Sequence, residues 1–597
     1  MRRSIATVCV SGTLEDKLAA AAAAGFDGIE IFENDLVVSS LSPREVRERC
    51  ADLGLTIELY QPFRDFEAMP DPLFRKNLDR AARKFEVMAE LGVGTMLVCS
   101  SVHPEAVDDD DLAAGQLSDL SDLASDFGVR IAYEALAWGR HVSTWDHSWR
   151  IVQRADHPSL GLCLDSFHVL SREVDPAGIA DITPGKIFFL QLADAPYLRM
   201  DVLQWSRHHR LFPGQGAFDL AGFVDLTLAA GYDGPLSLEV FNDVFRQADP
   251  ARTAVDAMRS LIALEDAGLP GFPDLSGYAF TEFAVDANSG PELRGTLRGL
   301  GFAHTGQHRT KPVELWEQSG CRIVLNSAVA RPQTAAITAF AISSADPSQS
   351  LQRAEALLAP AHPNVREPGE AELAAITAPD GTSVFVTDSA NDWRNDFLPT
   401  GSTAAGAGLL GTDHLGLAQP FDHFDEAGLF YHSVLGLSPL STEEYAAPFG
   451  LMRSRALTNK AGSIRLALSV SLLRRGDWAP AVSDPQHVAF TTADIVTTAS
   501  ALDLPRLSIP DNYYADLAAR FALPDDFVST LRSHGILYDR DSGGGELLHL
   551  YTPVLGGRVF FEILERRGGY DRFGEANAPV RMAAQRHSRL TSSSVRP

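Results

Sequence analysis

Basic clusters, long apolar runs and paired cysteines are all missing from this 597-residue sequence. The 51 lysine and arginine residues are outnumbered by 78 aspartate and glutamate residues, which gives a net charge of -27. Counterion release on nucleic acid or acidic lipid needs clustered cationic side chains, so we expect neither kind of partner. No stretch approaches the roughly 20 apolar residues of a membrane span, and the start MRRSIATVCVSGTLEDK lacks the apolar region of a signal peptide. These absences predict a cytoplasmic protein.

The five cysteines are widely spaced and form no Cys-x-x-Cys pair. This spacing suggests neither a disulfide framework nor a zinc ribbon. The rest of the composition is that of an ordinary globular protein, with 45% hydrophobic and 22% charged residues. The length is sufficient for roughly two to four domains.

Residues 1–268 alternate short β-rich runs with amphipathic helical segments. Eight strands, each followed by a helix, in roughly 250 residues predict a (β/α)8 barrel. The alternative is an open doubly wound sheet, but no Gly-x-Gly-x-x-Gly turn follows the first strand. The eight expected strands are SIATVCVSG, GIEIFE, TIELYQP, TMLVCSS, RIAYEAL, LGLCLDS, IFFLQLAD and GPLSLEV.

A Pro- and Gly-rich linker is expected at 269–277, and the pattern changes after it. In 278–578 strands outnumber helices, and the order strand, helix, then several strands recurs. This long period predicts an α+β domain built from duplicated modules. The polar segment 579–597 is expected to be a frayed tail.

Polar residues mark the carboxyl ends of four successive barrel strands, where the chemistry of such barrels is located. They are Glu134 in YEAL, Asp165 in LDSFH, Gln191 in LQLAD and Glu239 in LSLEV. Three carboxylates and an amide are hard ligands, suited to Mg²⁺, Mn²⁺ or Co²⁺. Asp165 alone could be a helix cap, but four such residues at equivalent strand ends favour a shared divalent metal.

The motifs GFDGIEIF, YEAL, LDSFH, LQLAD and LSLEV resemble the xylose-isomerase-like barrels, and among them the bacterial 3-dehydroshikimate dehydratases that carry a second domain. The resemblance implies that Glu134, Asp165, Gln191 and Glu239 hold one catalytic divalent metal. It also implies conversion of 3-dehydroshikimate to protocatechuate and water in quinate and shikimate catabolism. The metal would stabilise the dienolate that forms when a ring proton is removed.

The implied reaction needs proton transfer and a cationic clamp for the substrate carboxylate. We expect His168 to transfer the proton, the alternative being a histidine that only orients a metal ligand. Arg210 is placed with His168 among the catalytic residues, and Arg64 and Arg210 are both candidates for the clamp. Either arginine could instead be a solvated surface charge. Tyr60 and Ser206 could add hydroxyl contacts.

A second constellation lies in the C-terminal half, where His414 in TDHLGLA, His487 in PQHVAFTTADI and Glu562 in RVFFEILER are each on an expected strand. Two histidines and a carboxylate form the facial triad of non-haem Fe(II) enzymes. The surrounding stretches resemble 4-hydroxyphenylpyruvate dioxygenase, a vicinal-oxygen-chelate protein with βαβββ modules. The resemblance implies a second divalent metal, Mg²⁺ or Fe²⁺, at these three residues.

The sequence departs from that dioxygenase at positions that face its substrate. Ala467-Leu468-Ser469 replaces Pro-Leu-Asn, and His549-Leu550-Tyr551 replaces Gln-Ile-Phe. We therefore expect a metal site without turnover of 4-hydroxyphenylpyruvate. Two alternatives to the dehydratase remain: a metal-dependent sugar or inosose isomerase or epimerase on the same barrel, and an Fe(II) dioxygenase acting through the second domain. The substrate is a small molecule in each case, and assembly into a homo-oligomer is left open.

Overall fold

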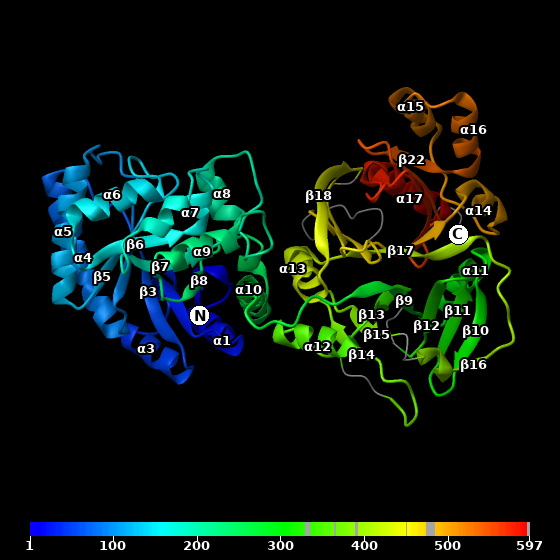
Figure 1. Cartoon of the computed structure of the whole chain (residues 1–597), viewed down its shortest axis with the longest axis horizontal. Helices are drawn as coiled ribbons and strands as arrows, with labels where there is room; N and C mark the ends of the chain where they lie inside the picture. Colours follow the sequence, from blue (N-terminus) through cyan, green and yellow to red (C-terminus); the bar gives the residue numbers. More distant parts are fainter. Residues whose placement is uncertain (329–334, 363–365, 389–391, 449, 473–483, 594–597) are drawn as a thin grey trace. The chain divides into compact units, whose positions relative to one another are not determined.

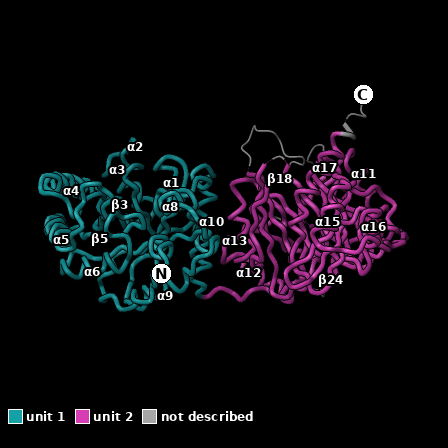
Figure 2. The backbone as a smooth tube through the Cα atoms, turned by 90° about the horizontal axis from the view of Figure 1, so that it is seen from above, with its two compact units in different colours: residues 1–267 teal, residues 268–597 magenta. Residues whose placement is uncertain are grey.

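The computed structural model of the chain describes residues 1–328, 335–362, 366–388, 392–448, 450–472 and 484–593. It divides into two compact units, Met1–Ala267 and Gly268–Pro597 (Figure 2). Within the described ranges, no helix has both the length and the apolarity needed to cross a membrane.

The first unit is a closed barrel of eight parallel strands in the order β1 to β8 (Figure 1). β8 pairs with β1 through Ser4↔Ser237, so the sheet has no free edge. This closure confirms the predicted (β/α)8 barrel and excludes the open doubly wound sheet. The strands are β1 (Arg3–Ala6), β2 (Gly28–Phe32), β3 (Thr56–Phe63), β4 (Thr95–Cys99), β5 (Arg130–Glu134), β6 (Leu160–Asp165), β7 (Ile187–Leu192) and β8 (Leu236–Leu238).

Helices cover the outside of the barrel, and several of them start at a side-chain cap. Thr13 and Ser42 each form a capping box with an acidic residue three positions later, which satisfies backbone N–H groups at the helix start. The helices are α1 (Leu14–Ala23), α2 (Glu33–Val38), α3 (Pro43–Asp52), α4 (Asp71–Leu91), α5 (Asp110–Asp126), α6 (Trp145–Ala155), α7 (Ser166–Leu170), α8 (Val202–His208), α9 (Leu220–Ala229) and α10 (Pro250–Glu265).

The barrel interior is apolar along the strands and becomes polar where they end. Leu59, Leu97, Ala132 and Phe189 are almost fully buried in one core cluster. β6 is buried along its whole length, up to Asp165. A buried strand that ends on a carboxylate places charge at the mouth of the barrel, where a ligand can reach it.

The second unit holds two eight-stranded mixed sheets, each built from two βαβββ modules. The first sheet has the order β14-β15-β13-β9-β12-β11-β10-β16. Its elements are β9 (Leu275–Ala284), α11 (Ser289–Gly299), β10 (Ala303–His308), β11 (Val313–Gln318), β12 (Cys321–Asn326), β13 (Ala336–Ser344), α12 (Pro347–Ala356), β14 (Ala374–Thr377), β15 (Ser383–Thr387) and β16 (Phe397–Pro399).

The second sheet repeats this plan with the order β18-β19-β20-β17-β21-β24-β23-β22. The predicted domain of duplicated vicinal-oxygen-chelate modules is thereby confirmed. Its elements are β17 (Leu409–Ala418), α13 (Phe424–Leu435), β18 (Ser438–Ala447), β19 (Gly450–Thr458), β20 (Arg465–Ser471), β21 (Gln486–Thr492), α14 (Ile495–Ala501), α15 (Asp511–Phe521), α16 (Asp525–His534), β22 (Leu537–Arg540), β23 (Glu546–Tyr551) and β24 (Val559–Arg567).

The C-terminal segment corrects one expectation. Instead of fraying from residue 579, the chain forms helix α17 (Ala578–Ser593), with Met582 and Ala584 buried. The buried side chains Met582, Ala584 and Gln585 give this largely polar segment one face that packs against the domain. Helix α17 lies against β18. The expected linker 269–277 is also partly ordered, since β9 already begins at Leu275.

Candidate functional site

Three carboxylates meet at the carboxyl ends of the barrel strands. Glu134 ends β5, Asp165 ends β6 and Glu239 directly follows β8. All three are buried. Arg210 Nη1 lies 2.6 Å from Asp165 Oδ2 and 3.1 Å from Glu239 Oε2, so one guanidinium bridges two of the strand ends.

Arg210 comes from the loop that follows β7 and is itself only 1% exposed. Its Nε and Nη2 both donate to Ser206 Oγ on α8, at 3.2 and 2.8 Å. Its guanidinium carbon lies 4.6 Å from the centre of the Phe167 ring. These contacts hold the Arg210 head in place, and Arg210 also contributes to the wall of the pocket described below, so its role as a clamp for the substrate carboxylate stays a prediction.

The pKa shifts at this centre follow from burial and from the crowding of negative charge. Burial and then repulsion by Asp165 and Glu239 raise the pKa of Glu134 well above its usual range. Burial raises the pKa of Glu239 to about 7, against the opposing effect of Arg210. Asp165 goes the other way: burial, the largest single cause, raises its pKa, but Arg210, His168 and the Phe167 N–H together lower the pKa of this carboxyl below its usual value. A single guanidinium thus leaves part of the negative charge uncompensated.

The donor atoms fit a divalent cation. Glu134 Oε1 is fully buried and has no hydrogen-bond partner. Donor oxygen atoms of Glu134 and Asp165 lie within 4.8 Å of each other. A buried carboxylate oxygen without a partner is costly, and an oxygen-rich site is what Mg²⁺, Mn²⁺ and Co²⁺ prefer.

His168 lies on α7, where its ring is buried against Trp138. Its Nδ1 accepts the N–H of Ala137 at 3.1 Å, so the proton of the neutral ring is on Nε2. Burial lowers the pKa of His168 to about 3, and the ring is therefore neutral. Nε2 lies 3.9 Å from Glu134 Oε1 and 3.7 Å from Asp165 Oδ2. In this tautomer Nε2 can donate a hydrogen bond towards the centre. It cannot accept a hydrogen bond from Arg210 Nη2, which lies 3.3 Å away.

Gln191 is in register with Asp165 on the neighbouring strand, but its amide faces another carboxyl group. Its Nε2 donates to Glu30 Oε2 at 2.6 Å, and its Oε1 accepts the Cys163 thiol at 3.4 Å. Glu30 on β2 also accepts from Ser237 and Gln61. The structure therefore places Gln191 beside the carboxylate centre, and its role as a metal ligand stays a prediction.

A hollow of about 370 Å³, counted with the solvent space at its mouth, opens above this centre. Its wall includes Arg64 and Ser206, as the sequence led us to expect. Tyr60 does not contribute to the wall, and its hydroxyl lies 3.4 Å from Glu33 Oε1. Trp138 and Arg207 are among the wall residues that sequence reasoning missed.

Arg207 is the more informative of the missed residues. Its neighbour in sequence, Ser206, had already been singled out in the loop SRHHR. Partial burial and then repulsion by Arg64 and Arg246 lower the pKa of Arg207. Cationic side chains that repel one another at a pocket mouth attract an anion.

The loop that carries Ser206 and Arg210 is held in place by Asp194, just beyond β7. Asp194 Oδ2 accepts the N–H groups of Gly214 and Gly216, both at 3.0 Å. A Cβ added at Gly216 would lie 2.3 Å from Asp194 Oδ1, so glycine is required for this close approach. The carboxylate therefore orders the loop that completes the pocket.

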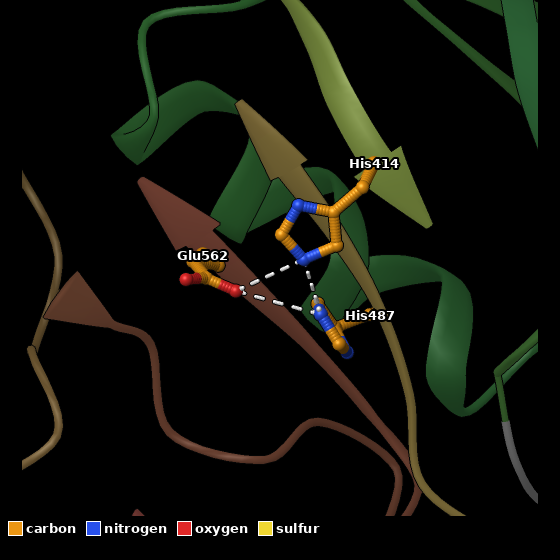
Figure 3. Close-up of side chains that lie close together, drawn as sticks. All are labelled: His414, His487 and Glu562. Carbon is orange, nitrogen blue, oxygen red and sulfur yellow. Dashed lines mark hydrogen bonds and ion pairs between the residues drawn. The ribbon is translucent and has the colours of Figure 1, made fainter. Parts of the chain in front are cut away.

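The second unit brings His414 of β17, His487 of β21 and Glu562 of β24 together (Figure 3). The two Nε2 atoms are 3.1 Å apart, and each lies 3.4 Å from Glu562 Oε2. Three ligands on one face of an octahedral ion with bonds of about 2.1 Å would be about 3.0 Å apart. The triad therefore fits a divalent metal with three positions left for other ligands.

Two members of this triad, His414 and Glu562, are also held by neighbours through their other polar atoms. His414 Nδ1 lies 2.8 Å from Asp413 Oδ1, and Arg566 holds Asp413 through two hydrogen bonds. Glu562 Oε1 lies 2.7 Å from His549 Nδ1. Such outer contacts orient ligands and leave one atom of each directed at the same point.

Comparisons with known proteins agree with this two-part organisation. The family described as Xylose isomerase-like TIM barrel matches residues 18–263, and the family described as Hydroxyphenylpyruvate dioxygenase, HPPD, N-terminal matches residues 273–396. A Pseudomonas putida protein named 3-dehydroshikimate dehydratase is 45% identical over 629 aligned residues, covering 99% of each chain. A 4-hydroxyphenylpyruvate dioxygenase of Pseudomonas aeruginosa is 28% identical, covering 50% of this chain and 90% of its own.

Among solved structures, a xylose isomerase-like TIM barrel/4-hydroxyphenylpyruvate dioxygenase fusion protein superposes with a TM-score of 0.91. It is 45% identical, and the match covers 98% of this chain and 100% of that chain. The fold and sites thus define a xylose isomerase-like barrel fused to a dioxygenase-like domain.

The chain belongs to the family of 3-dehydroshikimate dehydratases, which are hydro-lyases. The family predicted from the strand-end motifs is confirmed. The isomerase or epimerase and the Fe(II) dioxygenase are not favoured by these whole-chain matches. Both family matches and both clusters of ligating side chains indicate that the chain takes a divalent metal.

Proposed function

We propose that the barrel dehydrates 3-dehydroshikimate to protocatechuate at the centre formed by Glu134, Asp165 and Glu239. The observation that carries the proposal is the convergence of these three carboxylates under a pocket, in a chain 45% identical over its whole length to a dehydratase. One ring hydrogen and one hydroxyl group leave as water, and the ring becomes aromatic.

Glu134, Asp165 and Glu239 would hold the metal, and Gln191 beside them would be a fourth ligand. A bound Mg²⁺, Mn²⁺ or Co²⁺ supplies Lewis-acid stabilisation of negative charge on the substrate oxygens. The chain's own residues then have to orient the ring and move protons. The oxygen donors favour this group of ions and do not select one member of it.

His168 is the residue placed to give a proton. Because the Ala137 N–H occupies Nδ1, the proton on Nε2 faces the centre, where it can assist the departing hydroxyl group. Arg210 keeps positive charge beside the same carboxylates, and Ser206 holds its guanidinium in position. The base that removes the ring proton is then a carboxylate of the centre or a water molecule.

The substrate carboxylate would be bound by Arg64 and Arg207 at the pocket mouth. Both line the pocket, as does Arg210, whose guanidinium is already paired with Asp165 and Glu239. Two guanidinium groups around one carboxylate form charge-assisted hydrogen bonds that fix the ring relative to the centre. Neutral sugar substrates would gain nothing from this pair.

The test is a turnover assay on the full chain with 3-dehydroshikimate, following the ultraviolet absorbance of the catechol product. We expect activity to disappear with EDTA and to return with Mg²⁺, Mn²⁺ or Co²⁺. Glu134→Gln should bind less metal by elemental analysis and lose most turnover, while Glu90→Gln on α4, an exposed matched control, should retain both. Full activity in the EDTA-stripped protein, or in Glu134→Gln, would contradict the proposal.

A further inference from the structure

The second unit contains a pocket that the barrel chemistry does not use. A hollow of about 580 Å³, counted with the solvent space at its mouth, opens beside the triad. We call it the second-domain pocket. Its wall includes the triad (His414, His487 and Glu562), the aromatic Tyr551 and Phe560, one arginine, Arg581, and one further carboxylate, Glu575.

One end of the second-domain pocket is built for chelation. The three ligating atoms of the triad would occupy three coordination positions of a divalent ion and leave three others for a ligand in the pocket. A Cβ at Gly416 would lie 1.9 Å from the His487 ring, so this glycine lets the ring pack directly on β17. A ligand with two adjacent oxygen atoms can occupy two of the open positions.

The wall beside the triad is aromatic. The Phe560 ring stacks on His487, with ring centres 4.9 Å apart and an angle of 15° between planes. Tyr551, Tyr445 and Phe573 contribute to the same wall. These faces suit a planar ring, which gains contact area and offset stacking there.

The wall also contains the guanidinium of Arg581, which extends from α17. It lies 5.0 Å from the Phe560 ring centre and 5.5 Å from that of Tyr551. Its Nη1 donates to Gln585 Oε1, and no carboxylate of the described residues lies within ion-pair distance of it. An arginine that lines a pocket and lacks an acidic partner is suited to bind an anionic group of a ligand.

We infer that the second-domain pocket binds a dihydroxybenzoate-type ligand, whose adjacent hydroxyl oxygens chelate the metal and whose carboxylate pairs with Arg581. The ring would lie on the aromatic wall between these ends. A 2-oxo acid fits less well, because its carboxylate is consumed in chelation and leaves nothing anionic for Arg581. This inference rests on the geometry of the second unit, although the product of the proposed barrel reaction is a member of the same ligand class.

The test compares 3,4-dihydroxybenzoate with catechol, which lacks the carboxylate, by calorimetric titration of the full chain loaded with Mg²⁺. Hydrogen–deuterium exchange locates the binding, because the barrel is expected to bind the acid as well. We expect slower exchange in peptides over β23, β24 and α17. In wild type the acid should bind these elements at least about 10-fold more tightly than catechol, as expected for one charge-assisted hydrogen bond.

Arg581→Gln should remove this preference and leave catechol binding unchanged, which a merely structural defect would not do. Arg589→Gln, an exposed arginine on the same helix, is the matched control and should keep the preference. Protection confined to barrel peptides would overturn the inference. So would a preference that survives in Arg581→Gln, or tighter binding of 4-hydroxyphenylpyruvate than of dihydroxybenzoate.

Discussion

Glu67 is a buried carboxyl group that should make the barrel less stable as the pH rises. Its Oε1 accepts the Ser101 N–H at 2.6 Å and the Tyr133 hydroxyl at 3.1 Å, while its Oε2 has no partner. Burial is the largest cause that raises the pKa of Glu67 from 4.5 to about 7. Tyr133 directly precedes Glu134 on β5, so this carboxyl supports a strand of the proposed active site.

The sign of the effect follows from the raised pKa. The folded state favours the protonated form, so the stabilisation is complete below the unfolded-state pKa and is lost as the pH rises through about 7. A shift of this size lowers the free energy of unfolding by about 2.5 kcal/mol between about pH 5 and pH 8. The loss then levels off, because Glu67 is ionised in both states.

The assay is urea unfolding of wild type and Glu67→Gln across this pH range, with barrel unfolding followed separately from that of the second unit. The glutamine variant bears an unpaired N–H at every pH, which changes its free energy of unfolding by the same amount throughout. Only the change with pH in the difference between wild type and variant therefore tests the reasoning. We expect the free energy of unfolding of wild type minus that of the variant to fall by about 2.5 kcal/mol from about pH 5 to pH 8. Glu90→Gln is the exposed control. Parallel curves for wild type and Glu67→Gln would refute the reasoning.

Two further predictions concern arginines of the barrel. Arg210→Met leaves buried carboxylates without their cation and should destabilise the EDTA-treated barrel by about 3–5 kcal/mol in urea unfolding, with a smaller loss when Mg²⁺ is present. An equal loss under both conditions would contradict a metal at these carboxylates. Arg207→Met should raise KM for 3-dehydroshikimate about 10-fold or more with a smaller change in kcat, whereas Arg199→Met, also exposed but outside the pocket wall, should change neither. An unchanged KM in Arg207→Met would remove it from the clamp.

Much of the fold could be predicted from the sequence because its patterns are local and repeat. Each barrel strand is a short β-rich run, and several of the helices between them end at glycine, as at Gly92 after α4. Closure of the barrel needs no long-range information beyond the count of eight strands. Helix α17 was missed because its buried face is narrow, with Met582 and Ala584 among polar residues, and only the partner surface shows that it packs.

The candidate site could be predicted only as far as strand ends define it. Glu134, Asp165 and Glu239 could be placed together because parallel strands end at the same mouth of a barrel. The partner of Gln191 could not be predicted, because Gln191 on β7 bonds to Glu30 on β2, a strand that does not pair with β7. Arg207 could not be ranked above its neighbours, because which residue of a short helix faces a pocket depends on how the loop is anchored.

The two proposed centres differ in a way that bears on the metals they would take. The barrel centre consists of carboxylates with a guanidinium already among them, so a cation there would enter a site that is partly neutralised and made of oxygen donors. The second centre has two imidazoles and one carboxylate, with Asp413 and Arg566 fixing His414 from behind. Imidazole donors favour transition ions, whereas carboxylates also accept hard ions such as Mg²⁺. One chain can therefore hold different metals at the two centres. When an added ion restores activity, the metal content of each centre has to be measured, because the ion can bind at either one.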